Sequence, residues 1–233
     1  MKGNRRLFSI FLVCLLALSV FGGCVRQDPE QKPNTFGGSK DSLYLFTDLA
    51  VQDVTIESFD TKKYDIEEYK GFLEEEIAEY NKAHAYTPKA DGAASSKDEP
   101  HYSESVTLVR CETMNNKIFQ SLLYATAADY NSFPDNQIIL SRKNGTGLIT
   151  GTLANAPQVL LNTSFVTPNG TSVDLQSITT SQKAGEYRFM IADFSCFMYG
   201  DGEIIAYANG MEYSKENSCA SSGKAKYAIM IFH

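Results

Sequence analysis

The stretch SVTLVRCETMNNKIFQSLLY, residues 105–124, decides the fold class of this chain. Two runs rich in β-branched, aromatic and leucine side chains, 105–112 and 117–124, flank the tripeptide Met114, Asn115 and Asn116. Because asparagine tolerates the left-handed backbone conformation of tight turns, this pattern predicts a β-hairpin. An antiparallel pair of strands therefore stands at the centre of the expected fold.

A long amphipathic helix is predicted before this hairpin, over residues 65–83. Asp65 followed by Glu68 matches a capping box, which satisfies free amides at the start of a helix. Side chains spaced three or four residues apart then form one apolar stripe: Ile66, Tyr69, Leu73, Ile77, Tyr80 and His84. We expect the opposite face to be solvated, and it carries Glu67, Glu68, Glu74, Glu75, Glu79 and Asn81.

Further short elements are predicted after the hairpin. Thr126 to Asp129 form a second capping pattern, which predicts a helix of about two turns that ends at Phe133, before a proline. From Gln137 onward, short apolar runs alternate with glycine-containing turns, as in a series of antiparallel strands. The apolar residues of 226–232 predict a buried final strand, and weaker runs at 42–47 and 53–59 predict two early strands.

These elements predict an α+β fold with a mainly antiparallel β-sheet, one long amphipathic helix and a short second helix. We expect a single domain over residues 41–233, because one helix and two short strands could not sustain a core alone. Residues 87–104 form a polar loop that is unusually long for a compact domain. The loop is either a functional lid or a disposable insertion, and its composition favours the insertion.

Composition excludes several classes of function. The chain has 233 residues, of which 43% are hydrophobic, 12% aromatic and 21% charged, as in a globular protein. Its formal net charge of −7 disfavours a general nucleic-acid binder, which needs a basic surface to displace phosphate counterions. Anionic surfaces are disfavoured as partners for the same reason.

The N-terminus has the pattern of an export signal over residues 1–23. Lys2, Arg5 and Arg6 precede an uncharged apolar run from Leu7 to Phe21. These 15 residues would rise only about 22 Å as a helix, against a hydrocarbon core of about 30 Å, so the run is short for a permanent membrane span.

The sequence VFGGC, residues 20–24, resembles the lipobox of bacterial lipoproteins, with small residues at the two positions before the cysteine. The resemblance implies that Cys24 receives a diacylglyceryl group through a thioether, and that a peptidase cuts between Gly23 and Cys24. The new amine can then be acylated, with palmitate or a similar chain. Phe21 departs from the commoner Leu, Val or Ile of this motif. A simply cleaved signal and an uncleaved anchor are the alternatives.

Lipid attachment would place the protein at the cell membrane, anchored on the extracytoplasmic face of the cell envelope. Two acyl chains hold a protein stably, whereas one binds a membrane only marginally. Residues 24–40 contain Pro29, Pro33, Gly37 and Gly38 among many polar residues, which predicts a flexible tether. Removal of residues 1–23 deletes three cations and no anion, so the acidic remainder would be repelled by an anionic leaflet.

A second resemblance concerns the mature part of the chain. Residues 56–81, IESFDTKKYDIEEYKGFLEEEIAEYN, followed by YATAADYNSF at 124–133, are similar to a group of uncharacterised lipoproteins from Gram-positive anaerobes. The similarity covers roughly residues 54–133, under half of the mature chain. It supports the location and the fold, and it implies no catalytic residue.

Three cysteines remain in the expected exported domain: Cys111, Cys196 and Cys219. One disulfide and one leftover thiol are possible, and Cys196 with Cys219 is the favoured pair because both lie in the strand-rich C-terminal part. The alternative is that all three are small buried side chains. No Cys-x-x-Cys occurs, so zinc-ribbon and thioredoxin-like chemistry have no support.

Residues for catalysis or metal binding are scarce. The three histidines, His84, His101 and His233, are scattered along the chain, and a histidine-based site would need several of them to converge. The glycine-containing stretch 145–151 lacks the spacing of a phosphate-binding loop and fits a hairpin instead. Asp201 and Glu203 could act as acid and base only if the fold placed them about 5 to 10 Å from a partner acid.

We therefore expect an extracytoplasmic lipoprotein that serves as a binding or interaction module, with no cofactor, no metal and no catalytic residue assigned. A partner protein or glycan remains unidentified. Tyr199, Tyr207 and Tyr213 are candidates for a recognition surface, because tyrosine combines contact area with a polar tip. The alternative is a cell-envelope hydrolase that uses carboxylates on glycan or peptidoglycan substrates.

Overall fold

The computed structural model describes residues 41–86, 104–134, 147–214, 219–221 and 223–233. All of these residues fall in one compact unit, Phe36–His233. The predicted signal, tether, His101 and nearly all of the 87–104 loop lie outside the described residues. The described part has the predicted α+β class: two mostly antiparallel sheets, one long helix and several short helices. The fold class is therefore confirmed, and the second sheet is an addition to it.

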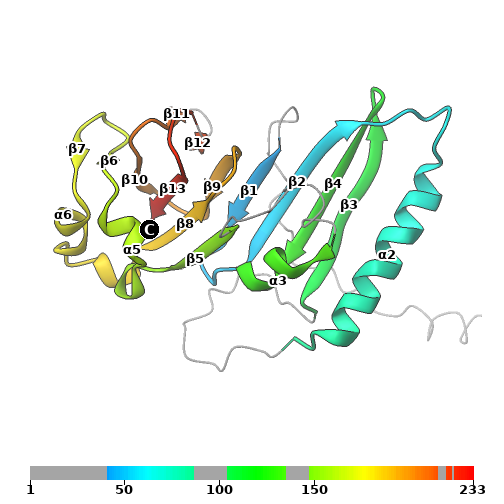
Figure 1. The fold of residues 1–233 in the computed structure, drawn as a ribbon, viewed down its shortest axis with the longest axis horizontal. Helices are drawn as coiled ribbons and strands as arrows, with labels where there is room; N and C mark the ends of the chain where they lie inside the picture. The colour runs from blue at the N-terminus through cyan, green and yellow to red at the C-terminus, as the bar shows by residue number, and fades with distance from the viewer. Residues whose placement is uncertain (1–40, 87–103, 135–146, 215–218, 222) are drawn as a thin grey trace, which may run out of the picture. The chain divides into compact units, whose positions relative to one another are not determined.

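The larger sheet contains the predicted hairpin. Its strand order is β11 (Glu212–Ser214), β12 (Cys219–Ser221), β9 (Phe197–Gly200), β1 (Ser42–Leu45), β2 (Val51–Ser58), β4 (Lys117–Tyr124) and β3 (Val106–Met114). Neighbouring strands are antiparallel except for β1 and β9, which are parallel. The sheet thus joins N-terminal and C-terminal strands, with β3 at one end (Figure 1).

The smaller sheet is entirely antiparallel. Its order is β5 (Leu148–Thr152), β8 (Arg188–Ala192), β13 (Ala228–Phe232), β10 (Ile204–Ala208), β6 (Phe165–Val166) and β7 (Ser172–Val173). Every residue of β13 is buried, and the strand lies between β8 and β10, which have the same length. The prediction of a buried final strand is therefore confirmed.

The hairpin of β3 and β4 has the predicted turn. Asn115 and Asn116 have φ values of 54° and 58°, both in the left-handed region that a two-residue hairpin turn requires. Pairing runs from Met114 with Lys117 to Val106 with Tyr124 and shifts register once, between Leu108 and Arg110. This irregularity is a β-bulge on the outermost strand of the sheet.

The long helix α2 (Ile66–Ala83) is confirmed with its predicted cap. The Asp65 side chain accepts a hydrogen bond from the Glu67 amide at 2.8 Å. Leu73, Ile77 and Tyr80 are buried and Tyr69 packs against the same core, so four of the six residues of the predicted stripe face it. The short helix α3 (Ala127–Ser132) is also confirmed, and it is capped by the Thr126 side chain.

Additional helical segments, not expected from the sequence, lie in the second half of the chain. They are α5 (Gln158–Leu161), α6 (Leu175–Thr179) and the 3-10 helices η1 (Leu153–Asn155) and η2 (Ala184–Glu186). Among the described residues, none of the helices is long and apolar enough to cross a membrane.

The two sheets share one hydrophobic core. Leu43, Leu45 and Met198 of the larger sheet belong to the same buried cluster as Met190 and Ile231 of the smaller sheet. Contact between β9 and β13 is close. A Cβ atom at Gly200 would lie 2.8 Å from the Phe232 ring, so glycine is required where the two strands meet.

Two asparagines clamp the first residues of two sheet-edge strands. The Asn81 side chain of α2 donates to the Val106 carbonyl (2.8 Å) and accepts from the Val106 amide (2.9 Å). The Asn131 side chain of α3 makes the same pair of bonds with the Leu148 carbonyl (2.7 Å) and amide (3.0 Å). Asn81, expected on a solvated helix face, thus has a structural role instead.

Candidate functional site

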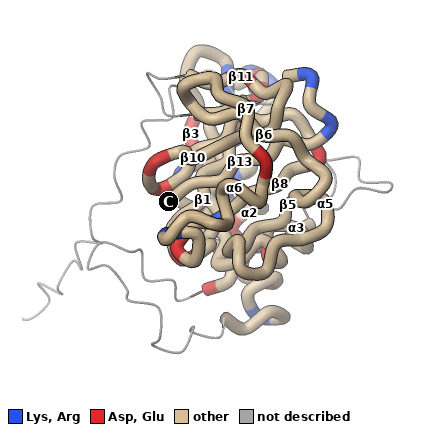
Figure 2. The backbone as a smooth tube through the Cα atoms, turned by 90° about the vertical axis from the view of Figure 1, so that its left-hand side faces the viewer, with Lys and Arg blue, Asp and Glu red and all other residues tan. Residues whose placement is uncertain are grey.

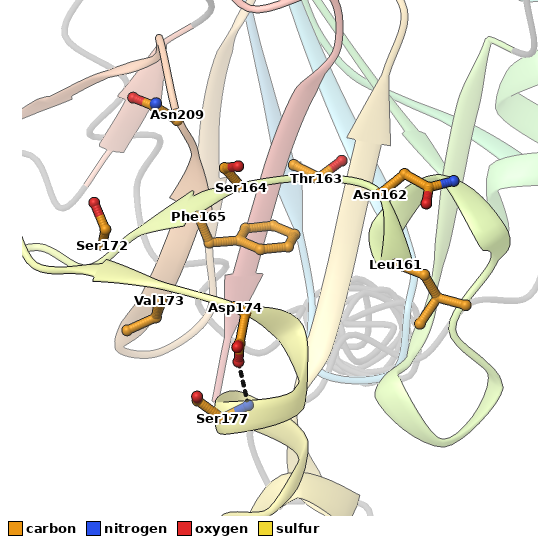
Figure 3. Close-up of a pocket in the computed structure, with 10 residues that line it drawn as sticks. All are labelled: Leu161, Asn162, Thr163, Ser164, Phe165, Ser172, Val173, Asp174, Ser177 and Asn209. Carbon is orange, nitrogen blue, oxygen red and sulfur yellow. Dashed lines mark hydrogen bonds between the residues drawn. The ribbon is translucent and has the colours of Figure 1, made fainter.

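A surface hollow lies where the hairpin of β6 and β7 opens. Phe165 pairs with Val173, and beyond this pair the chain diverges toward α5 on one side and α6 on the other. The hollow has a volume of about 680 Å³, and Figure 3 shows its side chains on both arms. It is lined by Leu161, Asn162, Thr163, Ser164, Phe165, Ser172, Val173, Asp174, Ser177 and Asn209.

Local hydrogen bonds hold the walls of this hollow in place. Phe165 is fully buried and lies between the two arms (Figure 3). The backbone N–H of Asn209 donates to the Ser164 carbonyl at 2.8 Å, which fixes the first arm against the end of β10. On the second arm, the Asp174 carboxylate accepts from the Ser177 amide at 2.7 Å and caps α6. Each arm of the hollow is thus held by a hydrogen bond of its own.

The lining of the hollow is polar but nearly uncharged. Asp174 is its single ionisable residue, and hydrogen bonds from Ser177 lower the pKa of this carboxyl below its usual value. The remaining polar side chains are amides and hydroxyls, and Leu161 contributes an exposed apolar rim. Residues 156–181 carry no other charge, as the tan tube around α5 and α6 in Figure 2 shows. Such a lining suits a neutral, hydrogen-bonding ligand.

Two histidines are described, and each has local partners. The His84 ring stacks on Tyr80 with centroids 4.0 Å apart, and its Nδ1 lies 3.1 Å from the Tyr80 carbonyl oxygen. His233 Nε2 lies 2.6 Å from a carboxylate oxygen of Glu186. The two rings therefore contact different elements, one at the end of α2 and the other beside η2.

Of the two candidate acids, Asp201 has a side-chain contact and Glu203 a backbone contact. Asp201 accepts a hydrogen bond from the Tyr44 hydroxyl at 3.1 Å. Burial, together with the nearby Asp201 charge, raises the pKa of Tyr44. The backbone carbonyl of Glu203 accepts from the His233 amide at 3.0 Å. These contacts do not test the hydrolase alternative, which stays a prediction.

The three candidate tyrosines do not form one exposed surface. Tyr207 is buried and stacks on Tyr213, with ring centroids 5.6 Å apart and an interplanar angle of 12°. Burial raises the pKa of Tyr207. Tyr199 lies on β9 of the larger sheet, which also contains Tyr213 on β11, and it pairs with Tyr44 and Cys219. Tyr199 and Tyr213 are both half-buried, so tyrosine recognition stays a prediction for these two, whereas the ring of Tyr207 belongs to the core.

The cysteines lie on three strands or strand ends. Cys111 is half-buried on β3, and burial raises the pKa of its thiol. Cys219 pairs with Tyr199. The buried Cys196 lies three residues before Tyr199 along the chain. That offset corresponds to about 10 Å, longer than the usual Cα separation of a disulfide. The side chain of Cys219 is not described, so the bridge stays a prediction that this register weighs against.

No group of three or more His, Cys, Asp or Glu side chains that could hold a metal ion occurs among the described residues. No family model matches the chain, and no match was found among curated proteins or among solved structures. Within the described residues, the hollow offers a candidate binding site. Sequence reasoning missed it, although Asp174 followed by Ser177, and the Asn209–Gly210 turn, mark two of its edges.

Proposed function

We propose that this chain is a lipoprotein anchored on the extracytoplasmic face of the cell membrane through Cys24, and that its folded part is a binding module. The anchor is supported by the basic start, the apolar run and the Gly22–Gly23–Cys24 sequence. The polar residues of 24–40 would then hold the folded part near the membrane without embedding it.

The hollow carries the binding part of this proposal. Its floor is the buried Phe165, and its rim presents amides and hydroxyls from both arms of an open hairpin. The ligand we propose is a neutral polyhydroxylated group, such as an envelope glycan. Amide and hydroxyl side chains can donate to and accept from sugar hydroxyls without the desolvation cost of a cation.

The anchor is tested by mass analysis of membrane and soluble fractions with Cys24→Ser. We expect the native protein in the membrane fraction with the mass of a cleaved, diacylated chain, and the variant without the added lipid mass. Cys111→Ser is the matched control, because it removes another cysteine and should leave the lipid mass unchanged. Membrane association and mass that are the same in Cys24→Ser and the native protein would refute lipidation.

The hollow is tested on the full-length lipoprotein in detergent, with an array of neutral oligosaccharides that includes N-acetylglucosamine oligomers. We expect Asn162→Ala and Asn209→Ala each to weaken binding of a retained oligosaccharide about tenfold, the equivalent of 1.4 kcal/mol. Gln176→Ala is the control, since Gln176 is exposed on α6 but does not line the hollow. Binding that is unaffected by both asparagine variants would assign the ligand to another surface.

A further inference from the structure

The outer edge of β3 is the longest strand edge at an end of either sheet. β3 has nine residues, whereas β5, β11 and β7, the other three end strands of the described sheets, have five, three and two. A strand edge presents backbone N–H and C=O groups that can pair with another chain. Natural proteins usually prevent such pairing with short edge strands, a covering element or repelling charges. The side chains of β3 therefore decide which partner fits.

The directions of the β3 backbone groups follow from its pairing with β4. In a two-residue hairpin the flanking pair, Met114 and Lys117, is hydrogen-bonded, and the pattern alternates along the strand. Thr113 and Cys111 therefore turn their N–H and C=O groups outward. At the other end of β3, the outward groups of Val106 are already bound by Asn81. The part of the edge left for pairing is Val109 to Thr113.

The side chains on this segment favour one register for pairing with the same strand of a second copy. Arg110 and Glu112 are exposed, point to the same face and form an ion pair within the chain. A two-fold axis at Cys111 would place Arg110 opposite Glu112 of a second copy, twice per dimer. An axis at Glu112 would place Glu112 against itself, and an axis at Arg110 would do the same with arginine, which is unfavourable in both cases.

We propose that the outer edge of β3 pairs antiparallel with the β3 edge of a second copy of this chain, with the two-fold axis at Cys111. The two larger sheets would then continue into each other. Arg110 and Glu112 would form a cluster of four charges of alternating sign, and Asn81 would end the pairing at Val106. Such an isologous contact is closed, as in most homodimers.

Cys111 makes the arrangement measurable. In a hydrogen-bonded antiparallel pair the two Cα atoms lie about 5.5 Å apart, within the 4.4–6.8 Å, roughly, that disulfides span. Burial raises the pKa of the Cys111 thiol, so this thiol is largely protonated at neutral pH and added oxidant is needed. Membranes that contain the full-length protein are therefore treated with copper phenanthroline. We expect a covalent dimer that Cys111→Ser abolishes.

Charge exchange tests the register independently of the cysteine. Dimerisation of the full-length lipoprotein is measured in detergent by sedimentation equilibrium. Arg110→Glu and Glu112→Arg each place like charges opposite each other, and we expect each to weaken the dimer at least tenfold. The double variant Arg110→Glu with Glu112→Arg restores opposite signs both within and between chains, and we expect it to restore most of the affinity.

Three results would overturn the proposal. The first is a protein that stays monomeric up to high concentration, which would mean that the bulge and the charges protect the edge from pairing. The second is a dimer that neither the charge variants nor Cys111→Ser affects, which would place the contact elsewhere. The third is oxidation that links Cys111 to a different protein, which would assign the edge to another chain. None of these variants removes Cys24, so each of these results leaves the proposed membrane anchor untouched.

Discussion

The two sheets solve the same problem with the same side-chain contact, on helices of very different length. In the larger sheet, α2 has 18 residues and its Asn81 binds the start of β3. In the smaller sheet, α3 has only six residues and its Asn131 binds the start of β5. In each case the residue before the clamped one still bonds to the neighbouring strand's end. The Ser105 carbonyl accepts from the Ala125 amide, and the Gly147 carbonyl accepts from the Asp193 amide. The asparagine amide thus takes the place of a missing strand.

The difference between the two edges lies beyond the clamped residue. β5 continues with the uncharged residues of LITGT, and it is five residues long. β3 continues for nine residues, with a bulge and the alternating charges of Arg110 and Glu112. A helix-borne amide therefore satisfies one position of an edge, and the rest must be handled by length, charge or a partner.

Removal of the clamps is expected to give the largest effect on stability. Val106 and Leu148 are 0% and 1% exposed, so Asn81→Ala and Asn131→Ala would each leave a buried amide and a buried carbonyl without a partner. We expect each variant to lower the free energy of unfolding by about 2–4 kcal/mol, measured by urea denaturation. Equal losses would show that the amide, rather than the length of the helix that carries it, determines the contribution.

Two controls make this comparison specific. Lys82→Ala removes an exposed side chain from the same helical turn as Asn81, and we expect a change within about 0.5 kcal/mol. Asn81→Asp keeps the acceptor for the Val106 amide but loses the donor to its carbonyl, so it should remain clearly destabilised. A loss below 0.5 kcal/mol in both alanine variants would contradict the role assigned to the clamps.

Tyr80 connects the two clamp-bearing helices and is expected to give a smaller effect. Its hydroxyl contacts the Ser132 hydroxyl and lies 3.2 Å from the Asp129 carboxylate, both on α3. Tyr80→Phe keeps the buried ring and removes these bonds, so we expect a loss of about 1 kcal/mol in urea denaturation. In the double variant with Asn131→Ala, the two losses should fail to add, because both changes loosen α3.

Because of Tyr80, we expect the free energy of unfolding to depend on pH in the alkaline range. Burial is the main cause that raises the pKa of Tyr80 above its usual value, and the nearby Asp129 charge adds to it. The unfolded chain therefore loses this proton first, at a pH of about 10, and the folded protein is destabilised as the pH rises further. We expect the urea midpoint to fall between pH 9 and 11, roughly, and to fall less steeply in Tyr80→Phe. An identical slope in both proteins would be evidence against this cause.

The features that the sequence predicted are those encoded by neighbouring residues. The cap at Asp65, the stripe of α2, the Asn115–Asn116 turn and the buried β13 each depend on a few adjacent positions, and the structure contains all of them. Local periodicity and turn chemistry therefore sufficed for the α+β class. The division of the strands into two sheets could not be predicted, because it depends on pairs such as the parallel β1 and β9, which are far apart in the chain.

The candidate site and the clamps depend on such distant pairs as well. Asn81 and Val106 are 25 positions apart, and Asn131 and Leu148 are 17 apart, so neither asparagine differs locally from a solvated helix residue. The hollow needs Asn209 of one turn beside Ser164 of another segment. The position opposite Cys219 is Tyr199, three residues after Cys196, and this strand register is not revealed by sequence spacing alone.

The turn of the β3 hairpin is expected to give the smallest effect, and it alters one edge only. Asn116 has a φ of 58°, a conformation that glycine adopts without a steric cost and alanine does not. We expect Asn116→Gly to raise the free energy of unfolding by about 0.5 kcal/mol and Asn116→Ala to lower it by about 1 kcal/mol. Amide hydrogen exchange should show the change in β3 and β4 and none in β5, because β5 is held by its own clamp on α3. If protection changed equally in β5, the two edges would form one cooperative unit, and their separate stabilisation would be wrong.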